Sequence, residues 1–283
     1  MRRTVWYFGI VLACCLIAVP IFSQSLDAQS ELRLGIAAYQ KYAYKQAATH
    51  FERAIAIDPN LVEAHFYLGL SCDAMYRPAE DSDGEENGNW AKCALREYNK
   101  VLALNPSHED ALKNQAFLLF NLARWDDSER SYRAAAALDP NDPEPLYMLS
   151  VLDLQRSFCL RAEKRDALHL SPTQSLIDRS ECNQLRTENL PRVEEGIALL
   201  EKVLKLVDDP DAADYMAFLY AERAEIQCGN RAAYLADLVK ADQWAARGHK
   251  SRSMRKIEPN RLRWAPAPPP LPPVGTSLGS LED

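Results

Sequence analysis

The sequence predicts an all-α fold, a right-handed α-solenoid of about five antiparallel helix hairpins. The chain of 283 residues has only 10 glycines and is rich in Ala, Leu, Glu and Arg, which favours helix over strand. Small, aromatic and proline residues also recur at a nearly fixed interval. Such a period is expected when each repeat is one supersecondary unit that packs only on its neighbours.

The recurring residues define a unit of 34 residues. Each of the first four units has a small residue in its predicted first helix, and these are Gly35, Gly69, Ala116 and Ser150. Their spacings are 34, 47 and 34, so the second unit carries 13 extra residues. The first three units end at prolines, which are Pro59, Pro106 and Pro140. A proline there stops the second helix because it cannot donate the helical hydrogen bond.

The pattern resembles the tetratricopeptide repeat (TPR), W-x2-L-G-x2-Y, then A-x3-F, then A, then P. In the first unit the matching residues are Gly35, Ala47, Phe51, Ala54 and Pro59. The resemblance implies two antiparallel helices a unit, small residues at their closest approach, and an aromatic residue (Phe51, Tyr98, Tyr132) filling the gap to the neighbouring pair. The sequence departs from the consensus at the expected Trp, which is replaced by Glu31, His65, Leu112 and Leu146, and at Gln115, where Leu is usual.

Three segments are expected. They are a signal peptide or anchor over 1–25, a TPR solenoid over 28–247, and a basic, then Pro-rich, disordered tail over 248–283. The solenoid divides into 28–61, 62–108, 109–142, 143–210 with an insert, and a capping pair over 211–247. In the fourth unit 34 extra residues separate Ser150 from Gly196. We favour an insert with some helix of its own at 160–190 over a degenerate repeat, which would place Asp166 at the aromatic position.

The stretch from about 145 to 248 is also similar to an uncharacterised group of exported bacterial TPR proteins. The similarity lies in 189–196 (NLPRVEEG), 215–220 (YMAFLY) and 241–244 (ADQW). It implies the fold and an exported location, but no settled activity.

The N-terminus predicts export. Arg2 and Arg3 precede an uncharged apolar run from Val5 to Phe22, and small residues at 23–25 suit cleavage. Two alternatives stay open: a retained anchor, although 18 apolar residues only just span a bilayer, and a lipoprotein modified at Cys14. The expected location is therefore periplasmic or extracellular, with a membrane-anchored form facing the periplasm as the alternative.

Five cysteines follow the signal. Cys72 and Cys93 flank the insert of the second unit, and Cys159 and Cys182 flank much of the insert of the fourth. Since export leads to an oxidising compartment, we predict the disulfides Cys72–Cys93 and Cys159–Cys182, each contributing on the order of 3 kcal/mol. Cys228 is then left as a buried thiol. The alternative is that all five are thiols in helix contacts.

No pattern for catalysis, a metal or a cofactor is present. None of the five histidines forms a metal-spaced pair with another His or with Cys, and no nucleophile elbow or phosphate loop occurs. Loss of Arg2 and Arg3 with the signal takes the net charge from −7 to −9, which disfavours nucleic-acid binding. The sequence therefore predicts a protein that is not an enzyme and has no cofactor.

The resemblance places the first helix of each pair on the concave face, where a partner protein or peptide would bind. The expected binding residues are Tyr39, Gln40, Phe66, Leu70, Lys113, Phe117, Phe120, Asn121, Tyr147 and Gln155, and Asp73, Val151 and Leu154 share this face. The alternative is that these side chains only pack on neighbouring helices. The Lys, Arg and Asn clamp for carboxylate tails is absent. The predicted function is a non-catalytic interaction scaffold in the cell envelope, or alternatively a membrane-anchored assembly subunit with a retained N-terminal helix.

The C-terminal tail differs in composition from the rest. Residues 247–264 carry a net charge of +6, and six prolines follow between Pro266 and Pro273. This segment could contact anionic lipid, cell-wall polymer or the acidic body of the protein itself. The Pro content predicts disorder.

Overall fold

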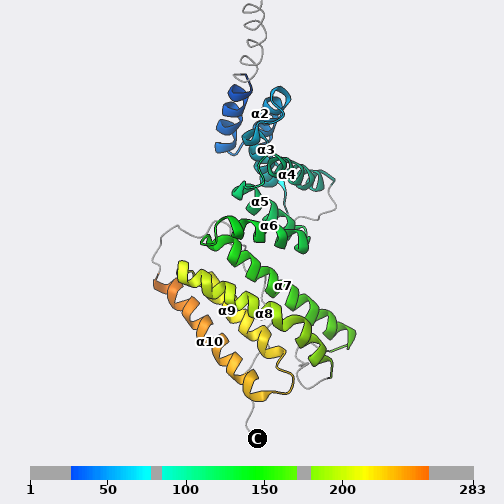
Figure 1. The fold of residues 1–283 in the computed structure, drawn as a ribbon, viewed down its shortest axis with the longest axis vertical. Coiled ribbons are helices and arrows are strands. Elements are labelled where there is room, and N and C mark those ends of the chain that lie inside the picture. The colour runs from blue at the N-terminus through cyan, green and yellow to red at the C-terminus, as the bar shows by residue number, and fades with distance from the viewer. Residues whose placement is uncertain (1–26, 78–84, 171–179, 255–283) are drawn as a thin grey trace, which may run out of the picture. The chain divides into compact units, whose positions relative to one another are not determined.

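The computed structural model describes residues 27–77, 85–170 and 180–254, and these form helices joined by short turns, with no strand among them (Figure 1). The predicted all-α architecture of TPR-like hairpins is confirmed. The chain divides into two compact units between Leu138 and Asp139. The predicted signal or anchor, residues 78–84 in the insert of the second unit, residues 171–179 and the tail beyond 254 lie outside the described residues. None of the described helices is long and apolar enough to cross a bilayer.

Unit 1 contains three helix hairpins. The first pairs residues 27–40 with α2 (Tyr44–Ile57), the second pairs α3 (Val62–Met75) with α4 (Glu85–Leu104), and the third pairs α5 (Glu109–Asn121) with α6 (Trp125–Leu138). Within unit 1 the boundaries agree with the 34-residue period and its one interrupted repeat.

The same turn ends each second helix of unit 1. The backbone N–H of Asn60 donates to Asp58 Oδ1 at 3.1 Å, that of Ser107 to Asn105 Oδ1 at 3.2 Å, and that of Asn141 to Asp139 Oδ1 at 2.9 Å. A proline lies between the two partners in every copy, where its fixed φ suits the turn. An Asp or Asn before the proline is therefore part of the stop signal, because its side chain replaces a backbone acceptor.

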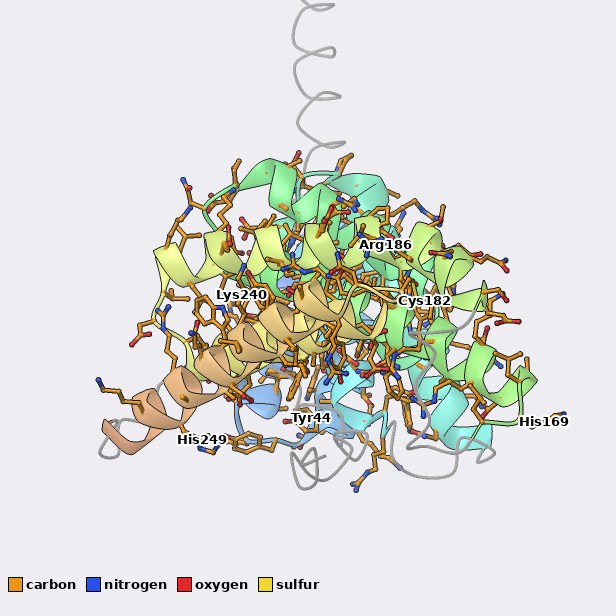
Figure 2. All side chains as sticks on the ribbon, turned by 90° about the horizontal axis from the view of Figure 1, so that it is seen from below. Tyr44, His169, Cys182, Arg186, Lys240 and His249 are labelled. Carbon is orange, nitrogen blue, oxygen red and sulfur yellow. A yellow bond between two sulfur atoms is a disulfide. The ribbon has the colours of Figure 1, made fainter. Side chains whose placement is uncertain are left out.

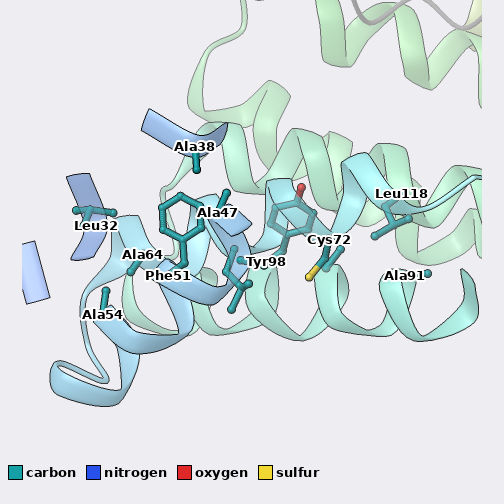
Figure 3. Packing of buried hydrophobic residues seen from close by; sticks show 13 residues of the cluster. Leu32, Ala38, Ala47, Phe51, Ala54, Ala64, Cys72, Ala91, Tyr98 and Leu118 are labelled. Carbon is teal, nitrogen blue, oxygen red and sulfur yellow. The ribbon is translucent and has the colours of Figure 1, made fainter. Parts of the chain in front are cut away.

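The core of unit 1 depends on close contacts between glycine and an aromatic ring. The Phe51 ring lies directly against the Gly35 backbone, and the Tyr98 ring lies against Gly69. Both rings are completely buried, and Figure 3 shows Phe51 and Tyr98 among the small side chains of the cluster. Phe51 also stacks on Tyr67 of the next hairpin, with ring centroids 5.6 Å apart. The aromatic position thus serves both its own hairpin and its neighbour.

Carboxylate–imidazole pairs occupy the place of the consensus Trp in two repeats. Glu31 accepts a 2.7 Å hydrogen bond from His50 Nδ1. One repeat later the residue types are exchanged, and His65 Nδ1 donates to Glu97 Oε2 at 2.7 Å. Burial opposes ionisation of Glu97, but hydrogen bonds from His65 and Arg96 hold the pKa of its carboxyl below its ordinary value. A polar contact across the hairpin therefore replaces an apolar one.

Gln115, which stands where Leu is usual, joins three helices. Its Nε2 donates to Asn99 Oδ1 at 2.8 Å, and its Oε1 accepts from Ser131 Oγ at 2.7 Å. These partners lie on α4 and α6, so the amide links the third hairpin to the second. In the same hairpin Ser128 Oγ donates to the carbonyl of Ala116 at 2.7 Å.

Unit 2 contains α7 (Pro143–Ala167), α8 (Ser180–Leu206), α9 (Pro210–Glu225) and α10 (Arg231–Met254), packed as the pairs α7–α8 and α9–α10. The described residues of the expected insert at 160–190 continue α7 and α8, which reach 25 and 27 residues. The last helix also continues to Met254, beyond the predicted end at 247.

Buried ion pairs connect the helices of unit 2. The Arg161 guanidinium of α7 binds both carboxylate oxygens of Glu222 on α9, with Nε at 2.9 Å from each. On the other side of α9, Arg223 binds Asp237 of α10, which also accepts from Gln227. A bidentate guanidinium–carboxylate pair fixes direction as well as distance, so these contacts set the register between long helices. The periodic pattern did not predict them.

The described residues contain two disulfides, of which one was predicted. Cys72 and Cys93 are bonded, with Cα atoms 5.9 Å apart. The predicted Cys159–Cys182 pair is wrong, because Cys182 is bonded to Cys228 instead. The reason is that the start of α8 lies against the α9–α10 turn. Arg186, one turn after Cys182 on α8 (Figure 2), donates to the Ile226 carbonyl at 3.0 Å. Cys159 remains a half-exposed thiol.

The glycine–aromatic contact predicts an unusual cost for an alanine in a helix. A Cβ at Gly69 would lie 2.7 Å from the Tyr98 ring, so Gly69→Ala must displace a buried side chain. We expect the free energy of unfolding to fall by about 1–2 kcal/mol net, although Ala is the better helix former. Urea denaturation followed by circular dichroism measures this. The matched control is Gly88→Ala on α4, where nothing lies within 4 Å and stability should be unchanged or slightly higher.

The cysteine pairing predicts a definite peptide map. Digestion without reduction should release the linked peptides Cys72–Cys93 and Cys182–Cys228. Among the five cysteines after residue 25, only Cys159 should react with iodoacetamide in the denatured, unreduced chain. Recovery of a Cys159–Cys182 peptide would show that the start of α8 has a different partner.

Candidate binding site

The first helices of unit 1 present a continuous face of large side chains, which we call the first-helix face. It is formed by Tyr39 on the first helix, by Phe66, Leu70 and Asp73 on α3, and by Phe117 and Phe120 on α5. All six side chains are half-buried. On α3 the three residues lie at i, i+4 and i+7, on one side of the helix, while Leu68, Gly69 and Cys72 point into the core.

Aromatic rings on and beside this face contact one another, and these contacts hold the rings in place. Tyr39 contacts Tyr44 and Tyr67 edge to face, at centroid distances of 5.4 and 5.9 Å. Phe66 contacts Tyr67 at 5.9 Å and lies 4.7 Å from the His108 ring, at the start of α5. Edge-to-face contacts of this kind restrict ring motion. The face therefore has ordered aromatic groups before any ligand binds.

The first-helix face also contains the carboxyl group of Asp73, which lies close to phenol groups. Asp73 Oδ2 accepts a hydrogen bond from the Tyr98 hydroxyl at 3.3 Å. Burial raises the pKa of the Asp73 carboxyl from its ordinary value of 3.8 to about 6, and the bond from Tyr98 only partly offsets this. The Asp73 charge in turn helps raise the pKa values of the Tyr39 and Tyr76 phenols, on which burial is the larger influence. Asp73 is thus surrounded by three phenols.

The predicted residues at the α5 end of the face have mixed surroundings. Lys113 forms ion pairs with Glu109 at 3.1 Å and with Asp110 at 3.9 Å, so its charge is already partly compensated. Phe117 and Phe120 are half-buried, as is Asn121, and Gln40 at the opposite end is exposed. Eight of the ten predicted residues therefore lie on unit 1, half-buried or exposed.

The two predicted residues of unit 2 do not belong to this surface. Tyr147 is completely buried, and its ring lies 5.4 Å from that of Tyr215 on α9. Its prediction as a contact residue is wrong, because α9 covers the position that is open in the earlier repeats. Gln155 is half-buried and its amide donates to Cys159 Sγ at 3.3 Å.

Sequence reasoning missed the surroundings of Asp73. Tyr76 follows α3, and Tyr67 and Tyr98 belong to core positions, so a helical-face argument did not include them. The available signal was composition, because Tyr39, Tyr42, Tyr44, Tyr67 and Tyr76 occur within 38 residues. In the part of the chain that the structure describes, no group of His, Cys, Asp and Glu side chains could hold a metal ion.

The hairpin geometry decides the fold family. In successive repeats a small residue of the first helix receives the aromatic ring of the second, and an Asx–Pro turn leads to the next pair. The chain has the TPR fold. The crystal structure of MamA protein matches with a TM-score of 0.54 at 12% identity, covering 82% of this chain and 97% of that one. A MamA from Desulfovibrio magneticus RS-1, residues 41 to the end, gives 0.54 at 14% identity and covers 81% and 97%.

A third TPR structure is also similar. YrrB, described as a TPR protein with an unusual peptide-binding site, gives a TM-score of 0.51 at 14% identity, covering 81% of this chain and 93% of that one. No protein-family model matches the sequence, and no curated protein matches it. At these identities the likeness concerns the TPR fold alone.

The burial of the Asp73 carboxylate predicts that Asp73→Asn raises the free energy of unfolding in a pH-dependent way. The pKa of Asp73 is about 6 in the folded protein and has its ordinary value of 3.8 in the unfolded chain. Between pH 3.8 and about 6 the folded protein therefore binds more protons than the unfolded chain. Stability is therefore lost as pH rises through this window. We expect Asn to raise the free energy of unfolding by about 1–2 kcal/mol at pH 7.5 and to change it little at pH 4.

Urea titrations at the two pH values measure this difference. Glu52→Gln, which removes an exposed carboxylate from α2, should show no such pH-dependent gain. Equal effects of Asp73→Asn at both pH values would contradict the burial of the charged form.

Proposed function

We propose that this TPR protein is a non-catalytic scaffold that binds an extended segment of a partner protein on the first-helix face of unit 1. The observation that carries the proposal is the row of half-exposed aromatic and aliphatic side chains on three neighbouring first helices. In unit 2, by contrast, the corresponding Tyr147 is covered. An apolar surface that the fold leaves uncovered in one unit and covers in the other indicates use by a partner.

The chemistry of the face suits a protein segment better than a small polar ligand. Large rings such as Phe66, Phe117 and Phe120 bury much area at little cost in side-chain entropy, and such residues dominate binding energy in protein interfaces. Their alignment across successive helices provides anchors at intervals along an extended chain. YrrB, which has the same fold, is described as having an unusual peptide-binding site, and this supports a peptide segment as the ligand.

We place the protein outside the cytoplasm, in the cell envelope or beyond it. The support is the pair of disulfides, Cys72–Cys93 and Cys182–Cys228, because such bonds persist in oxidising compartments. The apolar run after Arg2 and Arg3 agrees with this as an export signal. The Cys72–Cys93 bond joins the two helices of one hairpin, and the Cys182–Cys228 bond joins α8 to the α9–α10 turn.

Truncation of the α5 rings tests the binding surface. We expect the double variant Phe117→Ala, Phe120→Ala to lose its partner from an envelope extract by about tenfold or more in affinity capture, since aromatic anchors each contribute on the order of 2 kcal/mol. The matched control is Leu235→Ala with Val239→Ala, which removes two exposed apolar side chains from α10 and should leave capture unchanged.

Folding of the double variant is checked by circular dichroism. If it does not fold, a photo-cross-linking residue at the exposed Gln40 reports on the same face without altering the core. Undiminished capture by a folded double variant, or cross-links that contain no partner, would refute binding on this face.

A further inference from the structure

Among the described residues Asp73 has no cationic partner, in contrast to the carboxylates of Glu97, Glu222 and Asp237. Glu97 is bonded to His65 and Arg96, Glu222 to Arg161, and Asp237 to Arg223. Asp73 has only the neutral hydroxyl of Tyr98. A largely buried charge without a counterion is costly, so the site is complete only when a cation is supplied from elsewhere.

The rings around Asp73 define what kind of cation fits. The Asp73 charge acts on the phenols of Tyr39 and Tyr76, and the Tyr39 ring contacts Tyr67, which contacts Phe66. Aromatic faces attract cations, guanidinium most often. The guanidinium group of Arg is planar, always charged and weakly hydrated, so its burial costs less than that of an ammonium group. The neighbouring Leu70, Phe117 and Phe120 then offer apolar contact to whatever follows that residue in an extended chain.

One segment outside the described residues combines arginine with residues that can make apolar contacts along an extended chain. Residues 261–273 read RLRWAPAPPPLPP, with two arginines, one Trp, and prolines that favour the polyproline II helix. Polyproline II segments dock on aromatic-lined surfaces at low entropic cost. The charges are complementary, because residues 255–264 have a net charge of +3 and residues 26–138 have a net charge of −5, from 17 acidic and 12 basic side chains.

We propose that the segment 261–273 is a built-in ligand of the first-helix face, with the Arg263 guanidinium on the Asp73 carboxylate and Trp264 and the prolines across Phe66, Leu70, Phe117 and Phe120. This rests on the proposed function, and it names the chemistry that the face selects: a cationic side chain followed by prolines. An outside partner then has to displace the tail, which makes the tail a competitor for the same surface. The tail comes from the same chain or from a second copy.

Photo-cross-linking in the full chain tests the proposal. Benzoylphenylalanine replaces Trp264, and the adducts are mapped by mass spectrometry after irradiation. We expect adducts concentrated in residues 27–40, α3 and α5. An equal mixture of isotopically light and heavy chains shows whether a tail reaches its own unit 1 or that of another copy. Adducts spread over the surface, confined to unit 2, or absent would overturn the proposal.

Two substitutions probe the central contact. Arg263→Gln lies in the tail and cannot disturb the folded units, and Asp73→Asn keeps the size of the side chain. Each should lower the yield of adducts at least about fivefold, and the two together should lower it no further than either alone, because they remove the same interaction. The control Glu52→Gln deletes an equally negative but exposed charge and should leave the yield unchanged. Additive effects of Arg263→Gln and Asp73→Asn, or no effect of either, would refute the contact.

Capture of a partner separates this proposal from the proposed function. If the tail occupies the face, Arg263→Gln should increase capture of the partner by about fivefold in the full chain. A partner that needs Phe117 and Phe120 but is bound equally by the parent chain and by Arg263→Gln would preserve the scaffold function and refute the tail as its competitor.

Discussion

The closest approach of two helices in a hairpin is the constraint on which unit 1 depends. The Phe51 ring lies on Gly35 and the Tyr98 ring lies on Gly69 with no room for a Cβ. Because the ring fills this space and also contacts the next hairpin, one residue fixes both the closure of a hairpin and its stacking. The first helices are consequently held side by side, and the side chains that face away from this seam form the first-helix face. The first-helix face, the proposed binding surface, is therefore a product of the core packing.

In unit 2 the helices are also held in fixed positions, but by different interactions. Its small residue Gly196 lies on α8 and meets Leu219 of α9, with the Leu219 methyl carbons 3.1 Å from the position of a Cβ. The ion pairs Arg161–Glu222 and Arg223–Asp237, together with the Cys182–Cys228 bond, fix the register. This arrangement covers Tyr147. The helices of unit 2 are therefore fixed relative to one another, but the position that is open in unit 1 is buried.

The sequence was informative wherever the structure is periodic. The hairpin boundaries of unit 1, the stop-turns and the Cys72–Cys93 bond could be predicted because each concerns neighbours within one or two repeats. The prediction failed where contacts join segments outside the period. Cys228 lies in a turn with a positive φ of 47°, which nothing in its residue type indicates, and its sulfur reaches α8 through tertiary packing. In the same way the helical face containing Asp73 could be predicted, but the phenols of Tyr76 and Tyr98 that surround its carboxylate could not.

If the first-helix face binds a cationic segment as proposed, the cost of the Asp73 charge gives the face its selectivity. A methionine or leucine at this position would stabilise the free protein and would still bind apolar segments, but it would not distinguish a cationic segment from a neutral one. A carboxylate that is largely withdrawn from water and bonded only to a phenol has an unfavourable free energy that a bound guanidinium relieves. The relief adds to the affinity for cationic ligands alone, since a neutral ligand would bury the charge further. The buried charge lowers the stability of the free protein, and in the proposed complex the same charge favours cationic over neutral ligands. The aromatic rings that bury the carboxylate would also contact the cation.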